Sequence, residues 1–218
     1  MKLYYFPLST YSQKALIAFH EKQVPFEPVL VDLRDPQQRA QYQKTYPLGK
    51  VPLLVRDNGW MIPESTIIIE FLDTHSERGQ RLIPADPERA RQTRFMDRMM
   101  DLYLDNNVIT LVFQSWKPPA QRDQEAIEQA RRQIGITYDY MERALAGKPW
   151  LTGDEFSMAD CAAAPALLYA QQHCPFADRP NISAYWERLR ARPSYAKVLA
   201  EVMPYLEKLA AAANPKAA

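Results

Sequence analysis

The chain has 218 residues, of which 47% are hydrophobic and 24% are charged, a composition typical of a folded globular protein. Lys and Arg number 27 against 26 Asp and Glu, so the formal net charge of +1 leaves no electrostatic footprint for nucleic acid. The N-terminus lacks a signal-peptide segment and no apolar run approaches the roughly 18 residues of a membrane span, so we expect a cytoplasmic protein without membrane or nucleic-acid partners.

The two cysteines, Cys161 and Cys174, form neither a CxxC pair nor a metal-ligand spacing. Isolated cysteines in a chain of this size are typical of reduced thiols in a reducing compartment. We therefore expect free thiols and no metal site.

Strand and helix signals alternate over the first eighty residues. Pro7 closes a short aromatic run, Asp35 followed by Pro36 favours a helix start, and an Asn58-Gly59 turn between apolar runs indicates a hairpin. We expect strands at residues 2–6, 26–31, 51–55 and 60–62, and helices at 11–21, 35–44 and 66–75. The order βαβαββα predicts a small mixed sheet with helices on its faces, an α/β domain.

After residue 80 only helical periodicity remains. A proline-containing linker at residues 81–87 divides the chain into predicted domains over residues 1–80 and 88–218. Apolar residues along one stripe predict a long helix from Asp86 to Trp116. Further helices are expected before Gly147, at 157–173, 181–191 and 194–202, and after Pro204. The second domain is therefore predicted to be all helical.

The first notable motif is Lys50-Val51-Pro52, at the start of a predicted strand. Proline has no N–H to donate to a sheet, so it needs a special position there. If the bond before Pro52 is cis, the N–H and C=O of Val51 turn outward, where an extended peptide can pair with them. The simpler alternative is an ordinary proline on an edge strand.

The second motif, Glu64-Ser65, lies at a strand-to-helix junction. Ser65 is a natural N-cap for the following helix, and the same helix start attracts a carboxylate. Glu64 beside it is suited to an ammonium group. Together they match the α-amino acid end of a γ-glutamyl group, although capping alone is the simpler interpretation.

The third motif is a capping box with Ser157 at the N-cap and Asp160 three residues later. Its role is structural, since it sets the start of an alanine-rich helix. Pro165 within that helix is expected to kink it.

These motifs, joined in order by the linker at residues 81–87, resemble the cytosolic glutathione transferase superfamily over nearly the whole chain. Within that superfamily the chain resembles the bacterial, serine-type members, but the resemblance does not identify one class. The resemblance implies a thioredoxin-like N-terminal domain that binds glutathione, a helical domain that supplies the acceptor pocket, and a homodimer.

Conjugation requires a glutathione thiolate, whereas a free thiol with a pKa of about 8.5 is only partly ionised at neutral pH. The loop at residues 7–14 offers several hydroxyls at a helix start, and the residues alone do not choose among them. Resemblance to the serine-type classes aligns the catalytic serine with Ser9. The alternatives are Tyr5, Tyr11, Ser12 and Thr10, and helix capping is the simpler role for both serines.

Resemblance assigns the rest of glutathione to the first two motifs. The backbone of Val51 pairs with the cysteinyl unit, and Glu64 and Ser65 hold the γ-glutamyl end. Lys50 lies where the family places a residue near the glycine carboxylate, although a solvated turn lysine is the simpler interpretation.

Several residues of the helical domain have an expected role as well. Asp97 and Asp101 are alternatives for an acidic residue that reaches across the dimer. The candidates for the lining of the acceptor pocket are Tyr103, Phe113 and Trp116, although ordinary core packing is the simpler interpretation of these residues.

The expected function is conjugation of the glutathione thiolate to a small, hydrophobic electrophile, as in detoxification, with glutathione as co-substrate and no metal. Glutathione-dependent peroxide or disulfide reduction is a second possibility. The third is a non-catalytic binding module of the same fold, although such a module has no need for both Val51-Pro52 and Glu64-Ser65.

Overall fold

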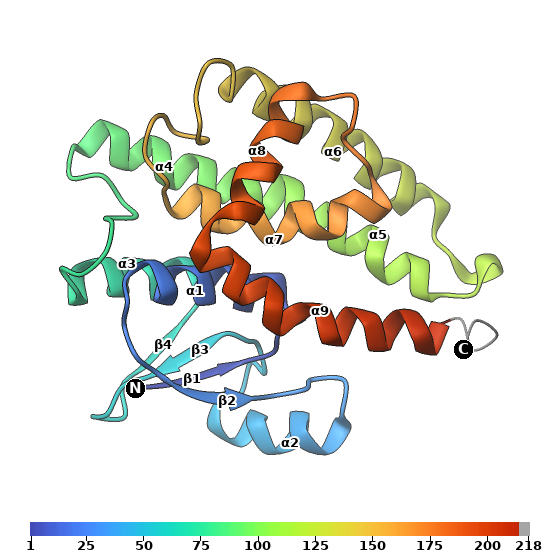
Figure 1. The fold of residues 1–218 in the computed structure, drawn as a ribbon. Helices are drawn as coiled ribbons and strands as arrows, with labels where there is room; N and C mark the ends of the chain where they lie inside the picture. Colours follow the sequence, from blue (N-terminus) through green and yellow to red (C-terminus); the bar gives the residue numbers. More distant parts are fainter. Residues whose placement is uncertain (214–218) are drawn as a thin grey trace. The chain divides into compact units, whose positions relative to one another are not determined.

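The computed structural model describes residues 1–213, so the last five residues of the expected helical domain, 214–218, lie outside the described part. The chain forms two compact units. Residues 1–80 and the C-terminal helix α9 (Pro193–Ala213) make up the first, and residues 81–192 make up the second (Figure 1). Helix α9 therefore packs with the N-terminal residues, whereas the sequence groups it with residues 88–218.

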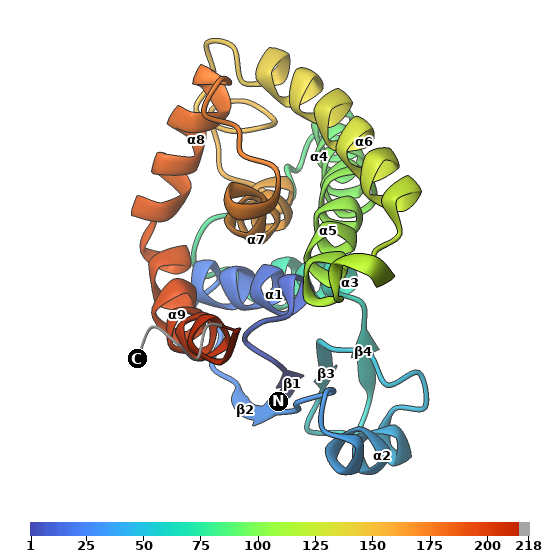
Figure 2. The same ribbon diagram turned by 90° about the vertical axis from the view of Figure 1, so that its right-hand side faces the viewer.

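The first unit contains a four-stranded mixed sheet of order β2-β1-β3-β4. Strand β1 pairs in parallel with β2 and antiparallel with β3, which pairs antiparallel with β4. Helices α1 and α3 lie on one face of the sheet and α2 lies on the other (Figure 2). This confirms the predicted α/β order. The elements are β1 (Lys2–Tyr5), α1 (Thr10–Glu21), β2 (Glu27–Leu30), α2 (Pro36–Thr45), β3 (Leu53–Val55), β4 (Met61–Pro63) and α3 (Ser65–His75).

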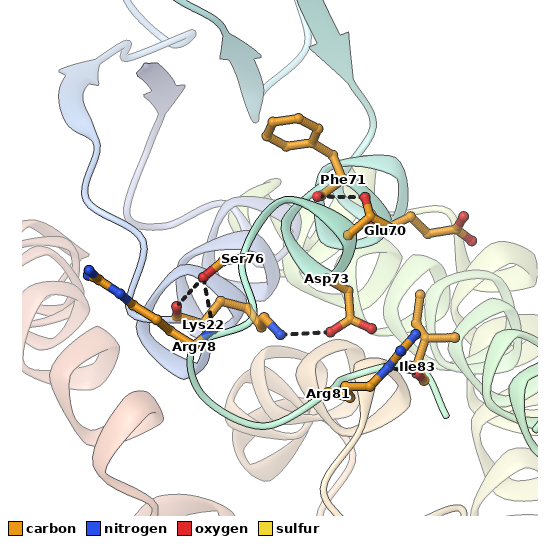
Figure 3. Close-up of polar contacts among 9 residues, drawn as sticks. Lys22, Glu70, Phe71, Asp73, Ser76, Arg78, Arg81 and Ile83 are labelled. Carbon is orange, nitrogen blue, oxygen red and sulfur yellow. Dashed lines mark hydrogen bonds and ion pairs between the residues drawn. The ribbon is translucent and has the colours of Figure 1, made fainter. Parts of the chain in front are cut away.

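A buried ion pair joins helices α1 and α3. The Lys22 ammonium lies 3.1 Å from the Asp73 carboxylate, and the two side chains are only 1% and 2% exposed (Figure 3). The Ser76 hydroxyl donates to the Lys22 carbonyl oxygen at 3.4 Å. Gly79 has a φ of +67°, and a Cβ there would lie 1.8 Å from the Glu21 carbonyl oxygen, so only glycine allows this close approach.

The second unit is helical, as predicted. The expected helix from Asp86 to Trp116 is interrupted by a π-helical segment, whose wider turn holds an extra residue, and Met100 and Leu104 within it are fully buried. The expected break at Pro204 is wrong, because α9 continues through that proline. The elements are α4 (Pro87–Met99), π-helix η1 (Met100–Asp105), α5 (Asn106–Trp116), 3₁₀ helix η2 (Pro119–Gln121), α6 (Gln124–Ala144), α7 (Met158–His173) and α8 (Pro180–Ala191).

The capping box at the start of α7 is present, with Ser157 at the N-cap and Pro165 inside the helix. The Asp160 carboxylate accepts hydrogen bonds from the Ser157 N–H at 2.8 Å, the Leu151 N–H at 3.0 Å and the Tyr185 hydroxyl at 2.7 Å. Asp160 is fully buried, so these bonds replace the water that its oxygens lose. Among the described residues, none of the helices combines the length and apolarity needed to cross a bilayer.

Candidate functional site

Three chain segments meet at one end of the sheet in the first unit. Leu53 at the start of β3 pairs with Tyr4 near the end of β1 and with Pro63 at the end of β4. Because β1 and β4 both run antiparallel to β3, the loop after β1, the residues before β3 and the junction after β4 share this end. The pairing therefore brings together the three segments on which the predicted glutathione residues lie.

Ser9 is the N-cap of helix α1. Its Oγ accepts a 3.2 Å hydrogen bond from the Ser12 N–H, and its side chain is half-buried. Within residues 1–213 this hydroxyl donates no hydrogen bond, so its proton is available to a ligand. Capping and donation to a thiolate are therefore compatible roles for the same side chain.

Two other hydroxyls of this region, those of Ser12 and Tyr5, are placed less favourably for a ligand. Ser12 is fully buried, and its Oγ accepts from the Phe6 N–H at 3.3 Å. The Tyr5 hydroxyl donates to the Glu201 carboxylate at 2.5 Å. Burial of its ring, and then this carboxylate, raise the pKa of Tyr5 well above its usual value. Tyr11 is half-buried and Thr10 is buried.

The peptide bond between Val51 and Pro52 is cis. Val51 is half-buried, and within residues 1–213 neither its N–H nor its C=O is hydrogen-bonded to another residue. The preceding residue is held in place, since the Tyr42 hydroxyl donates to the Lys50 carbonyl oxygen at 2.8 Å. The Lys50 side chain itself is exposed.

At the start of α3 the predicted cap is wrong by one residue. Glu64 is the N-cap, with φ +67° and ψ +122°, and its exposed carboxylate makes no capping hydrogen bond. Ser65 is the first helical residue and is 4% exposed. The positive φ of Glu64 ends the strand abruptly, so the helix begins one position earlier than a serine cap predicts. The amides of the first turn have no partners within the helix, which favours an anion.

Lys14 is a residue of the site that was not predicted from the sequence. This residue of α1 is 1% exposed, and its ammonium donates to the Thr66 hydroxyl at 2.8 Å, at the start of α3. A lysine among apolar residues at helical spacing, between Tyr11 and Ala18, was the available signal. Its charge adds to the positive end of the α3 dipole.

The predicted acceptor residues lie in the second unit. Tyr103, Phe113 and Trp116 are 46%, 54% and 58% exposed, so they are not core residues of the chain. The rings of Phe113 and Trp116 lie 5.2 Å apart. Asp97 and Asp101 are 0% and 3% exposed. Within the described residues no cluster of three potential metal ligands occurs.

Comparisons with known proteins agree with this arrangement. The family model described as "Glutathione S-transferase, N-terminal domain" matches residues 3–80, and "Glutathione S-transferase, C-terminal domain" matches residues 104–193. The chain is 31% identical over 211 residues to "Glutathione S-transferase 3" of Zea mays, covering 93% of this chain and 94% of that protein. It is 30% identical over 211 residues to "Glutathione S-transferase hmp2" of Hypomyces subiculosus, covering 92% and 98% respectively.

Among solved structures, a glutathione S-transferase from Methylobacillus flagellatus with glutathione bound has a TM-score of 0.82 at 25% identity, covering 90% of this chain and 98% of that one. Glutathione transferase F2 of Populus trichocarpa has a TM-score of 0.81 at 27% identity, covering 93% and 99% respectively.

Proposed function

This chain belongs to the glutathione S-transferase family, and on that premise we propose that it transfers the sulfur of glutathione to a small, hydrophobic electrophile. The observation that carries the proposal is the meeting of three segments at one end of the sheet, where Leu53 pairs with both Tyr4 and Pro63. One segment supplies a hydroxyl at a helix start, one an unpaired backbone edge, and one a second helix start. A small acidic tripeptide needs these three features.

Glutathione binding is assigned residue by residue. The N–H and C=O of Val51 pair with the cysteinyl unit, in the manner of an added strand. The first turn of α3, beginning at Ser65, receives the γ-glutamyl carboxylate, and the exposed Glu64 carboxylate receives its ammonium. The exposed Lys50 side chain is assigned to the glycine carboxylate.

Thiol activation is assigned to Ser9. Its hydroxyl keeps a proton to donate, and it lies at the positive end of α1, so both effects favour the thiolate over the thiol. Tyr5 is a weaker candidate because its proton is held by Glu201, and Ser12 because it is fully buried. This assignment places the protein in a serine-type class.

The acceptor is assigned to exposed aromatic side chains of the helical unit. Tyr103, Phe113 and Trp116 offer apolar surface, which suits a hydrophobic electrophile. We assign the reaction to the cytoplasm, as part of detoxification.

A homodimer is also proposed. The second unit exposes apolar side chains on α4, η1 and α6, and the rings of Phe95 and Tyr140 lie 6.2 Å apart. Phe95 is 48% exposed and Ile136 on α6 is 63% exposed, a pattern that a second copy of the chain would cover. Light scattering coupled to size exclusion tests this: a dimer mass is expected, and a monomer mass at micromolar concentration contradicts it.

Calorimetric titration with glutathione and turnover of an activated aryl halide test the function. We expect micromolar to millimolar affinity for glutathione and measurable conjugation. The Ser9→Ala variant should lose about 100-fold in kcat, the cost of removing one donor to a developing charge, and should raise the pKa of the bound thiol. Ser12→Ala removes the other serine hydroxyl of this loop and should raise the thiol pKa less than Ser9→Ala does. Absence of glutathione binding in the wild type removes the proposal.

Two further assays test the alternative functions, glutathione-dependent reduction and binding without catalysis. A peroxide assay coupled to a glutathione reductase detects the reductive alternative. Binding without turnover across a panel of electrophiles indicates a non-catalytic module, in which case Ser9 acts only as the cap of α1.

A further inference from the structure

The C-terminal helix α9 contacts the end of strand β1 through two side chains one helical turn apart. The Tyr5 hydroxyl donates a 2.5 Å hydrogen bond to the Glu201 carboxylate. The ring of Tyr205 lies edge-on to the ring of Phe6, with centroids 5.7 Å apart. Residues four apart share one face of a helix, so a single face of α9 holds two consecutive residues of the chain.

Phe6 in turn holds the loop that follows it. Its N–H donates to the Ser12 Oγ at 3.3 Å, and its carbonyl oxygen accepts from the Ser9 N–H at 2.9 Å. The Arg34 guanidinium lies 4.9 Å from the centre of the Phe6 ring. The backbone that carries the Ser9 hydroxyl is therefore anchored on a residue whose side chain packs against α9.

Pro204 lies between the two contacts made by α9. Proline has no N–H, so the helix lacks one internal hydrogen bond at this point and the turns beyond it are less firmly joined to those before it. The first half of α9 is anchored by fully buried Tyr195, Val198 and Val202. On either side of the proline, Glu201 contacts Tyr5 and Tyr205 contacts Phe6.

We propose that Glu201 is a positioning residue: by accepting the Tyr5 hydrogen bond it holds α9 against Phe6, and so keeps the loop at residues 7–14, which carries Ser9, in place for the glutathione sulfur. The inference rests on the proposed function. It gives Tyr5 a role that does not involve contact with the sulfur, and it makes the C-terminal helix part of the thiol site.

The test compares Tyr5→Phe, Glu201→Leu, the double variant and Glu201→Gln, whose amide oxygen still accepts a hydrogen bond. We expect Tyr5→Phe and Glu201→Leu each to lower kcat/KM for an aryl halide about tenfold, and the double variant to lose no more, because they remove the same interaction. Glu201→Gln should stay within about threefold of the wild type. Glu207→Gln, on the same helix and exposed, is the matched control and should be unchanged.

Two further readouts separate positioning from direct chemistry. Amide hydrogen exchange in residues 201–211 should accelerate in Glu201→Leu and Tyr5→Phe, and the pKa of the bound thiol should rise by the same amount in both, because both variants release the loop that carries Ser9. A thiol pKa that rises in Tyr5→Phe but not in Glu201→Leu overturns the proposal, as do wild-type exchange and kcat/KM in Glu201→Leu. If the wild type binds no glutathione, the proposed function fails, whereas hydrogen exchange still reports whether Glu201 holds the helix.

Discussion

The Tyr42 hydroxyl donates a 2.8 Å hydrogen bond to the Lys50 carbonyl oxygen, which ties helix α2 to the residue just before the backbone edge at Val51. Tyr42 is 4% exposed, and burial raises its pKa far above the usual value, so the phenol remains a donor at any physiological pH.

Replacement of Tyr42 by Phe removes this donor and leaves the carbonyl to find another. We expect the Kd for glutathione to rise about fivefold to tenfold, the effect of losing one buried hydrogen bond at the site. Titration calorimetry measures it. Tyr4→Phe is the control, since its half-buried ring lies 5.6 Å from that of Tyr42. Equal affinities in the wild type and Tyr42→Phe contradict the prediction.

We expect Glu64 to lower the stability of the fold through its strained backbone and to strengthen glutathione binding through its carboxylate. Its φ of +67° lies in a region where a residue other than glycine is strained by about 1–3 kcal/mol. Glu64→Gly should raise the free energy of unfolding by about 1 kcal/mol and weaken glutathione binding about tenfold. Glu64→Ala should weaken binding equally without the gain in stability. Denaturant unfolding and calorimetry distinguish the two, and a Glu64→Gly variant less stable than Glu64→Ala refutes the strain argument.

The buried ion pair between Lys22 and Asp73 predicts a large cost for removing one partner. Lys22→Met leaves the Asp73 carboxylate buried without this cation, so the free energy of unfolding should fall by about 3 kcal/mol. Arg91→Met is the control, because its pair with Glu88 is 71% and 76% exposed and should contribute less than about 1 kcal/mol. Denaturant unfolding curves measure both, and equal effects contradict the prediction.

Two half-buried histidines predict a stability that depends on pH. Burial, and then the charge of Lys197, lower the pKa of His20, and burial lowers the pKa of His173. With a folded pKa below the unfolded value, the unfolded chain binds more protons in the interval between them. Stability should therefore be complete above pH 6.5 or so and fall as the pH drops from there towards the folded pKa.

Thermal melting between about pH 5 and 7.5 measures this dependence. A double variant, His20→Gln with His173→Gln, should show a flatter curve than the wild type over this interval. A wild-type melting temperature that rises as the pH falls has the opposite sign and excludes the explanation.

The order of elements was predictable because each carries a local signal. The Asp35-Pro36 start of α2 and the capping box of Ser157 and Asp160 depend on side chains a few residues apart. The three segments of the candidate site were predictable on the same basis, together with the resemblance to a known family.

Features that depend on distant partners were not predictable. Periodicity shows that α9 has an apolar face but does not show which part of the chain covers it. The Tyr5–Glu201 hydrogen bond joins residues 196 positions apart. The N-cap is Glu64 and not the predicted Ser65. Glutamate rarely adopts a positive φ, so no sequence rule anticipates a cap at this residue.

The division of the chain has a consequence for its synthesis. The first unit needs α9, whose buried Tyr195, Val198 and Val202 leave the ribosome only after the entire second unit has been made. The N-terminal sheet and its helices must therefore wait, incompletely covered, while the middle of the protein is translated and folds. Nascent chains stalled before residue 193 should engage chaperones that the finished protein does not need.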